Sequence, residues 1–133
     1  DGSYNIKTKE YGFGCILIEG QKVIKELSGK GDKEALVSMR NVAGEILGSL
    51  AAMEFALENG YPGVCIYYDY EGIEKWANGL WRANKIGTQN YQKLVNEYRK
   101  KINISFIKVL AHSGDFFNER ADKLAKKAVG ING

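Results

Sequence analysis

Residues His112–Ala125 read HSGDFFNERADKLA and carry the most informative pattern in the chain. They follow the apolar run Ser105–Leu110, which we expect to form a strand, and they open with a polar loop that contains the single histidine. Asp115 is of a residue type that caps helices, and the apolar spacing beyond it predicts a helix to about Val129. This part of the chain is therefore predicted to be a strand, a loop and an amphipathic helix.

The segments upstream alternate between strand and helix patterns. A hairpin of Tyr11–Ile18 and Lys22–Ser28 turns at Glu19 and Gly20, and Gly29–Arg40 is predicted to be a loop. The remaining predicted elements are a helix over Asn41–Glu58, a strand over Val64–Tyr68, and helices over Gly72–Trp81 and Thr88–Lys101. Strands separated by helices pair in parallel, so we predict an α/β fold whose mixed sheet is flanked by helices.

The composition is that of an ordinary globular protein. With 133 residues, 44% of them apolar and 26% charged, we expect residues 1–133 to form a single domain. No apolar run approaches the ~20 residues of a membrane helix, and we expect no contact with membranes. Cys15 and Cys65 lie in apolar strand patterns, where a free cysteine acts as a small hydrophobe. A reducing, cytoplasmic setting is therefore expected, and a disulfide is disfavoured.

A basic and aromatic segment lies in the middle of the chain. Basic residues among aromatic ones can hold phosphates and stack on sugars or bases. The alternative is two solvated helix faces whose aromatic side chains point into the core, and on this segment alone we favour that alternative. The residues are Lys75, Arg82, Lys85, Lys93, Arg99, Lys100 and Lys101, with Trp76, Trp81, Tyr91 and Tyr98.

Two acids occupy positions typical of functional groups. Asp69 directly follows a buried strand, at the edge where ligands bind in open α/β sheets, although it could simply cap the next helix. Glu45 lies near the start of its helix, where an acid also complements the helix dipole. Gly44 beside it costs helix stability, which suggests a close approach, and Asn41 presents an amide on the same face.

Three further residues are candidates with equally simple alternatives. Asp122 borders the apolar stripe of the last helix, but it could be a solvated acid paired with Lys126 four residues later. Asp1 opens an Asp-Gly-Ser sequence, although a terminal residue is usually frayed. His112 is alone in the chain, yet its place on a loop after a strand favours a functional role.

In combination and in order, these features resemble the type 1 ribonuclease H family over essentially the whole chain. The closing motif is the most specific part of the resemblance. The matching residues are Asp1-Gly2-Ser3 with Asn5, Gly12-Phe13-Gly14, Asn41 with Glu45, Asp69, and His112 and Gly114 followed by Asn118-Glu119, Asp122 and Leu124-Ala125.

The resemblance implies a five-stranded mixed sheet and a monomer that cleaves the RNA strand of RNA–DNA hybrids, leaving 5′-phosphate and 3′-hydroxyl ends. It implies that Asp1, Glu45, Asp69 and Asp122 hold two Mg²⁺ ions, which Mn²⁺ could replace. His112 would move protons or aid product release. The substrate-binding residues would be Gly2, Ser3, Asn5, Asn41 and Asn118, with Trp81, Arg82 and Lys85 expected by position at the DNA strand.

Three departures from the family pattern affect these expectations. Val42 stands where many members have a second amide, Tyr70 and Glu71 replace small polar residues, and no strand precedes Asp1. We therefore expect the sequence to start inside a longer protein, similar to bacterial members with an N-terminal viroplasmin-like, hybrid-binding module. The alternatives are a DNA-cutting relative of the same fold and a module that binds nucleic acid without cutting it.

Overall fold

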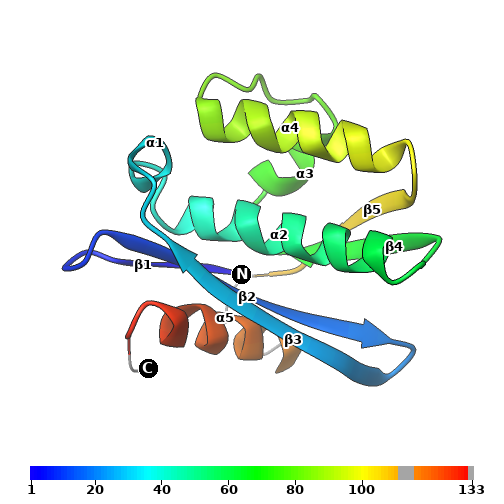
Figure 1. Cartoon of the computed structure of the whole chain (residues 1–133), viewed down its shortest axis with the longest axis horizontal. Coiled ribbons are helices and arrows are strands. Elements are labelled where there is room, and N and C mark those ends of the chain that lie inside the picture. The colour runs from blue at the N-terminus through cyan, green and yellow to red at the C-terminus, as the bar shows by residue number, and fades with distance from the viewer. Residues whose placement is uncertain (111–115, 132–133) are drawn as a thin grey trace.

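A computed structural model describes residues 1–110 and 116–131. The chain opens with three antiparallel strands in sequence order, β1 (Gly2–Asn5), β2 (Glu10–Glu19) and β3 (Lys22–Gly31). The turn between β2 and β3 places Gly20 at a φ of 65°, a conformation that glycine adopts without strain. Figure 1 shows these strands as a long, twisted hairpin with β1 alongside.

The second half of the chain builds a parallel pair of strands. β4 (Gly63–Tyr68) pairs with β5 (Asn103–Lys108), with Tyr67 opposite Ile107. A parallel pair needs a crossover connection, and here two helices supply it. The helices of the chain are α1 (Glu34–Val37), α2 (Asn41–Glu58), α3 (Gly72–Ala77), α4 (Ile86–Arg99) and α5 (Phe116–Ala128).

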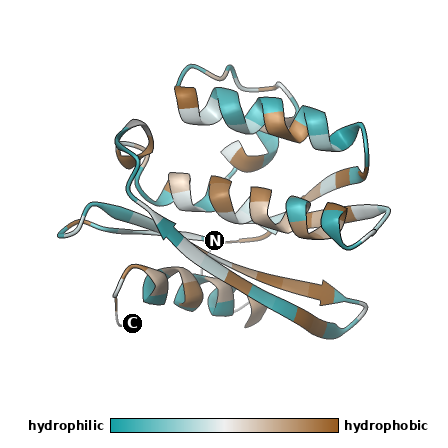
Figure 2. Cartoon of the chain, in the orientation of Figure 1, coloured by the Kyte–Doolittle hydropathy of each residue, from teal (hydrophilic) through white to brown (hydrophobic). Residues whose placement is uncertain are grey.

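Helix α2 lies at the centre of the fold, with α4 on one side and the strands on the other (Figure 1). Most of α2 is apolar, whereas the outer surface of α4 is largely hydrophilic (Figure 2). The core that they enclose includes five side chains with almost no exposed surface, namely Tyr11, Met53, Ile73, Tyr91 and Val95. Helix α5 packs against β2 and, more lightly, against β1 and β3.

Glycines set how closely the helices approach β2. A Cβ on Gly14 would overlap the carbonyl oxygen of Ala121 in α5, and one on Gly44 of α2 would overlap the carbonyl oxygen of Gly12. Backbone therefore touches backbone at these positions, and any side chain would separate the elements. The Gly44 contact was expected from its cost to the helix, and the structure confirms it.

The predicted α/β class, the β2–β3 hairpin, α2 and β4 are confirmed, and Asn59 and Gly60 end α2 as expected. Several predicted boundaries were wrong. The helix predicted to reach Trp81 ends at Ala77, and the predicted loop contains the end of β3 and the single turn of α1. Helix α4 spans Ile86–Arg99 instead of the predicted Thr88–Lys101, and β5 spans Asn103–Lys108 instead of the predicted Ser105–Leu110.

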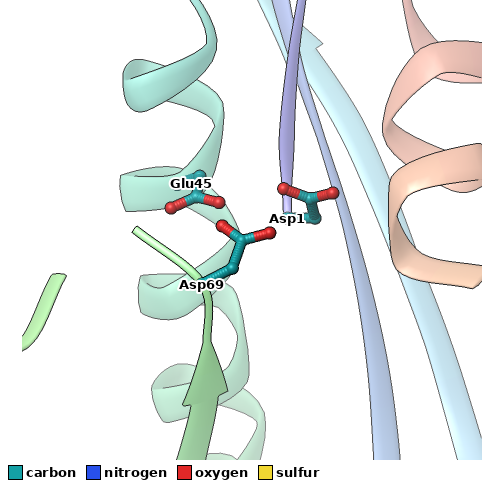
Figure 3. Close-up of side chains that lie close together, drawn as sticks. All are labelled: Asp1, Glu45 and Asp69. Atoms are coloured by element: carbon teal, nitrogen blue, oxygen red, sulfur yellow. The ribbon is translucent and has the colours of Figure 1, made fainter. Parts of the chain in front are cut away.

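A strand that the sequence did not predict follows Asp1. Gly2–Asn5 pair with β2 from Gly2 opposite Phe13 to Asn5 opposite Glu10. The described strands form two hydrogen-bonded sheets, one antiparallel and one parallel, rather than one ladder of five. Figure 3 shows Asp1, which directly precedes β1, close to Asp69, which directly follows β4, so the start of β1 lies near the end of β4.

The predicted cap Asp115 lies outside the described residues. Among those that are described, no helix has the length and hydropathy that crossing a bilayer requires.

Candidate metal centre

Three acids from distant parts of the sequence meet at one point. Asp1 precedes β1, Glu45 lies in the second turn of α2, and Asp69 directly follows β4. Each offers a carboxylate oxygen, and these oxygens all lie within 4.8 Å of one another. Figure 3 shows the three side chains turned toward a common space. The structure thus brings together three of the four acids proposed from the sequence.

Asp1 is fixed by the strand beside it. Its amino group donates a hydrogen bond to the carbonyl oxygen of Gly14 (2.8 Å), and the amide of Gly14 donates to its carbonyl oxygen (3.0 Å). Its carboxylate accepts a further hydrogen bond of 2.8 Å from the amide of Gly2. The glycines in the Asp-Gly-Ser and Gly-Phe-Gly sequences therefore hold this acid in place.

Glu45 is the buried member of the group, with 6% of its surface exposed. Burial, and then the neighbouring Asp69, raise the pKa of Glu45 to about 8. Its Oε2 atom is buried and has no hydrogen-bond partner among the described residues. A buried carboxylate oxygen without a partner is costly, and a cation at this point would offset that cost.

Asp69 completes the group from the end of β4. The side-chain amide of Asn118 in α5 lies 3.5 Å from its Oδ2 atom, as a donor. The acids and Asn118 line a cavity of about 20 Å³ together with Ser49 and Tyr68. Sequence analysis did not identify Ser49, although its spacing of one helical turn from Glu45 places both on the same face of α2.

The three acids offer carboxylate oxygens as ligands, which is the chemistry that Mg²⁺ and Mn²⁺ prefer over zinc. Crowded carboxylates repel one another, and cations between them relieve that repulsion. The donor set and the partnerless oxygen of Glu45 therefore fit a divalent metal ion.

The fourth proposed ligand, Asp122, stands apart from the three acids. Its Oδ2 atom forms an ion pair of 2.9 Å with the ammonium of Lys126, one turn further along α5. This is the pairing that the sequence offered as the alternative to metal binding. His112 lies outside the described residues.

The predicted substrate-binding residues fall into two groups. Gly2 and Ser3 are buried beside α2, and Asn41 is exposed at the start of that helix. The side-chain NH₂ group of Asn5 donates a hydrogen bond to the carbonyl oxygen of Val129 (2.7 Å), and the side-chain oxygen of Asn5 accepts one from the backbone amide of Lys7 (3.0 Å). The described contacts of Asn5 therefore hold the β1–β2 turn against the end of α5.

The second group surrounds a separate cleft of about 340 Å³. Arg82 and Lys85 line it, together with Met39, Val42, Tyr70 and Trp76. The ring of Trp81 packs edge-on against Trp76, at a centroid distance of 5.7 Å, and the ammonium of Lys75 lies 5.5 Å from the centre of the Trp81 ring. Two basic residues of the segment, Arg82 and Lys85, therefore meet the aromatic Trp76 at a hollow surface, whereas Tyr91 is buried in the core.

Nothing in the sequence indicated the unusual backbone conformation of one surface residue, Arg40. Arg40, directly before α2, has a φ of 52°, and its guanidinium lies 5.5 Å from the centre of the Tyr4 ring. Such a backbone conformation is rare for a residue other than glycine.

Comparisons with known proteins point in one direction. The sequence model of a family described as RNase H matches residues 1–130. A ribonuclease H from Rhizobium meliloti is 30% identical over 144 residues, covering 97% of this chain and 86% of that protein. The holo form of a ribonuclease H domain from D. hafniense is 41% identical, with a TM-score of 0.55, and covers 100% of this chain and 87% of that one. LC11-RNase H1, in a crystal structure with RNA/DNA hybrid, has a TM-score of 0.77 at 18% identity, covering 97% and 92%.

Proposed function

This chain belongs to the ribonuclease H family, and on that premise we propose that it cuts the RNA strand of RNA–DNA hybrids by metal-dependent hydrolysis. The products would carry 5′-phosphate and 3′-hydroxyl ends, as the family resemblance implies. The observation that carries the proposal is the convergence of Asp1, Glu45 and Asp69, with their ligand oxygens within 4.8 Å of one another.

We assign the metal ligands as Asp1, Glu45, Asp69 and Asp122. Bound Mg²⁺ or Mn²⁺, two ions in the full site, would supply Lewis acidity at the scissile phosphate and lower the pKa of water. The chain itself contributes the fixed positions of the acids. Asp1 is held through its backbone, and Glu45 is held by close packing of α2 on the strands. Asp122 would join the site by leaving Lys126.

His112 would carry a proton to or from the reacting group, because it is the only side chain of the chain with an ordinary pKa near neutrality. In the sequence it stands between β5 and α5, outside the described residues. Asn118 would stand between substrate and metal centre, since its amide already lies 3.5 Å from Asp69.

The two strands of the hybrid would occupy different surfaces. Asn41, exposed at the start of α2 one turn from Glu45, is suited to the RNA 2′-hydroxyl, the group that distinguishes RNA from DNA. Gly2 and Ser3, buried beside α2, would act by holding Asp1 next to α2. Trp81, Arg82 and Lys85 would hold the DNA strand near the 340 Å³ cleft, where Arg82 and Lys85 add positive charge.

The experiment is cleavage of a hybrid whose RNA and DNA strands are labelled separately, with Mg²⁺, by the chain and by its Asp69→Asn variant. Duplex DNA and single-stranded RNA serve as substrate controls. Cutting of the RNA strand alone, lost in the variant, is the expected result. Cutting of duplex DNA would instead favour a DNA nuclease of this fold, and binding of hybrid without any cutting would favour a non-catalytic module.

A further inference from the structure

One face of α5 carries a cation as well as an acid next to the metal centre. Asn118, Asp122 and Lys126 are spaced four residues apart, so they follow one another along the same face of the helix. Asn118 reaches Asp69, and Asp122 is paired with Lys126. The ion pair therefore continues the row of residues that begins at the metal centre.

The packing of α5 on β2 brings this face close to Asp1. The backbone of Gly14 exchanges hydrogen bonds with Asp1, while its Cα lies against the backbone of Ala121 and Ala125 in α5. The absence of a side chain at Gly14 thus places the turn of α5 that includes Asp122 next to the strand that fixes Asp1. Asp122 nevertheless lies outside the group of three acids, and its carboxylate is paired with Lys126.

The Asp122–Lys126 pair is, as a pair, better shielded than the other four ion pairs formed among the described residues. The two side chains are 20% and 34% exposed, whereas those of the Glu97–Lys100 pair are 56% and 71% exposed. Partial burial reduces screening by water and salt, so a pair of this kind is more stable than a fully exposed one.

We infer that Lys126 is a built-in competitor for Asp122, a cation of the chain that a metal ion must displace before Asp122 can serve as a ligand. The inference rests on the proposed function, in which Asp122 is a ligand. Lys126 thereby weakens metal binding at the part of the centre that involves Asp122. The acids Asp1, Glu45 and Asp69 are unaffected by this competition, so they take up the first ion regardless of Lys126.

The test measures binding of Mn²⁺ to the metal-free chain without nucleic acid. Calorimetry gives the dissociation constants, and the loss of the electron paramagnetic resonance signal of free Mn²⁺ gives the amount bound. Lys126→Met removes the charge and keeps the length of the side chain. Lys127→Met is the matched control, because it removes the same charge from the neighbouring, exposed position, which forms no ion pair with any described residue. Lys126→Arg keeps the ion pair.

We expect Lys126→Met to lower the dissociation constant of the weaker Mn²⁺ site about two- to fivefold, the range that one partly shielded ion pair supplies. Lys127→Met and Lys126→Arg should bind as the original chain does. If Lys126→Met bound Mn²⁺ no more tightly than the original chain, the inference would be overturned. It would also be overturned if Lys127→Met gained as much Mn²⁺ affinity as Lys126→Met, because the gain would then be a general effect of charge.

Hybrid cleavage by the same preparations separates this inference from the proposed function. A chain that cuts hybrid, but whose Mn²⁺ binding does not respond to Lys126→Met, keeps its function and overturns the role of Lys126 alone. A chain that binds no Mn²⁺ overturns both. Binding that tightens in Lys126→Met, without cleavage of hybrid by any variant, supports the competition and contradicts the nuclease.

Discussion

Glu45 and Asp69 lie on different elements, yet the carboxylate of Asp69 helps to set the charge state of Glu45. Burial of Glu45 is the larger cause of its raised pKa, and the charge and hydrogen bonding of Asp69 are the next causes, so that Glu45 titrates at about 8 instead of 4.5. The folded, metal-free chain therefore retains a proton on Glu45 at neutral pH. A metal ion that binds there must release that proton.

The first prediction concerns stability against pH without metal. Because the pKa of Glu45 is higher in the folded chain than in the unfolded one, the folded state binds the proton more tightly. Glu45 thus contributes stability below pH 4.5 that is lost as the pH rises toward about 8. Denaturant unfolding in EDTA at several pH values should show a loss of up to about 1.4 kcal/mol per pH unit in that window.

Glu45→Gln is the control for this prediction, since it keeps the shape of the side chain and cannot ionise. Its free energy of unfolding should be nearly flat over the same window and should exceed that of the original chain at pH 8. Identical pH profiles for the two proteins would mean that Glu45 does not titrate in this way.

The second prediction concerns Asp69→Asn. Loss of this ligand should lower hybrid cleavage at least about a hundredfold, because the metal centre loses one of its fixed oxygens. The fold should survive, and in EDTA the variant should be more stable than the original chain above about pH 8, where Glu45 is ionised, because the ionised Glu45 then has no negative neighbour. Cleavage assays and thermal unfolding measure the two effects.

Asp32→Asn serves as the matched control, because Asp32 is an exposed acid outside the three-acid group. It should leave both cleavage and stability unchanged. An Asp69→Asn variant that remains active, or one that no longer folds, would contradict the assignment of Asp69.

The parts of the site that the sequence predicts are those held by long, regular elements. The apolar run before Asp69 and the helical spacing around Glu45 each fix one acid, and the parallel register of β4 and β5 places Asp69 at a sheet edge. Gly44, a glycine within a helix, signals the close contact that brings α2 to Gly12. Two of the four proposed ligands, Glu45 and Asp69, could therefore be placed from the residues themselves, whereas Asp1 was proposed through the family resemblance.

The parts that the sequence does not predict are short or depend on tertiary contacts. β1 has four residues, two of them polar, so its strand pattern is weak and only pairing with β2 makes it a strand. The single turn of α1 is too short for any periodic signal. Whether Asp122 pairs with Lys126 or joins the other acids depends on the position of α5. The spacing of residues in the sequence does not determine that position.

The third prediction uses the contact between Gly44 and Gly12. A methyl group at Gly44 would overlap backbone rather than a flexible side chain, so α2 would have to move away from β1 and β2. Gly44→Ala should lower the free energy of unfolding by about 1–3 kcal/mol and should weaken Mn²⁺ binding, because Glu45 is the next residue. Denaturant unfolding and calorimetry report the two losses.

Gly48→Ala, one turn further along the same helix, is the comparison. Its Cβ would lie 3.4 Å from the Cβ of Phe13, an ordinary contact, and alanine favours the helix. We expect Gly48→Ala to be neutral or stabilising by up to about 1 kcal/mol. A Gly44→Ala variant as stable as Gly48→Ala would show that the close approach of α2 to the strands is not needed.

The fourth prediction concerns the backbone of Arg40, whose φ of 52° and ψ of −127° favour glycine. Arg40→Gly relieves that strain but loses the contact with the Tyr4 ring, whereas Arg40→Ala loses the contact and keeps the strain. Arg40→Gly should therefore be more stable than Arg40→Ala by about 1–2 kcal/mol in denaturant unfolding. At Lys9, which has a φ of 58° in the β1–β2 turn, Lys9→Gly should likewise be more stable than Lys9→Ala. If alanine proved as stable as glycine at position 40, the strain at the entrance to α2 would be absent in solution, and α2 would begin in a different backbone conformation.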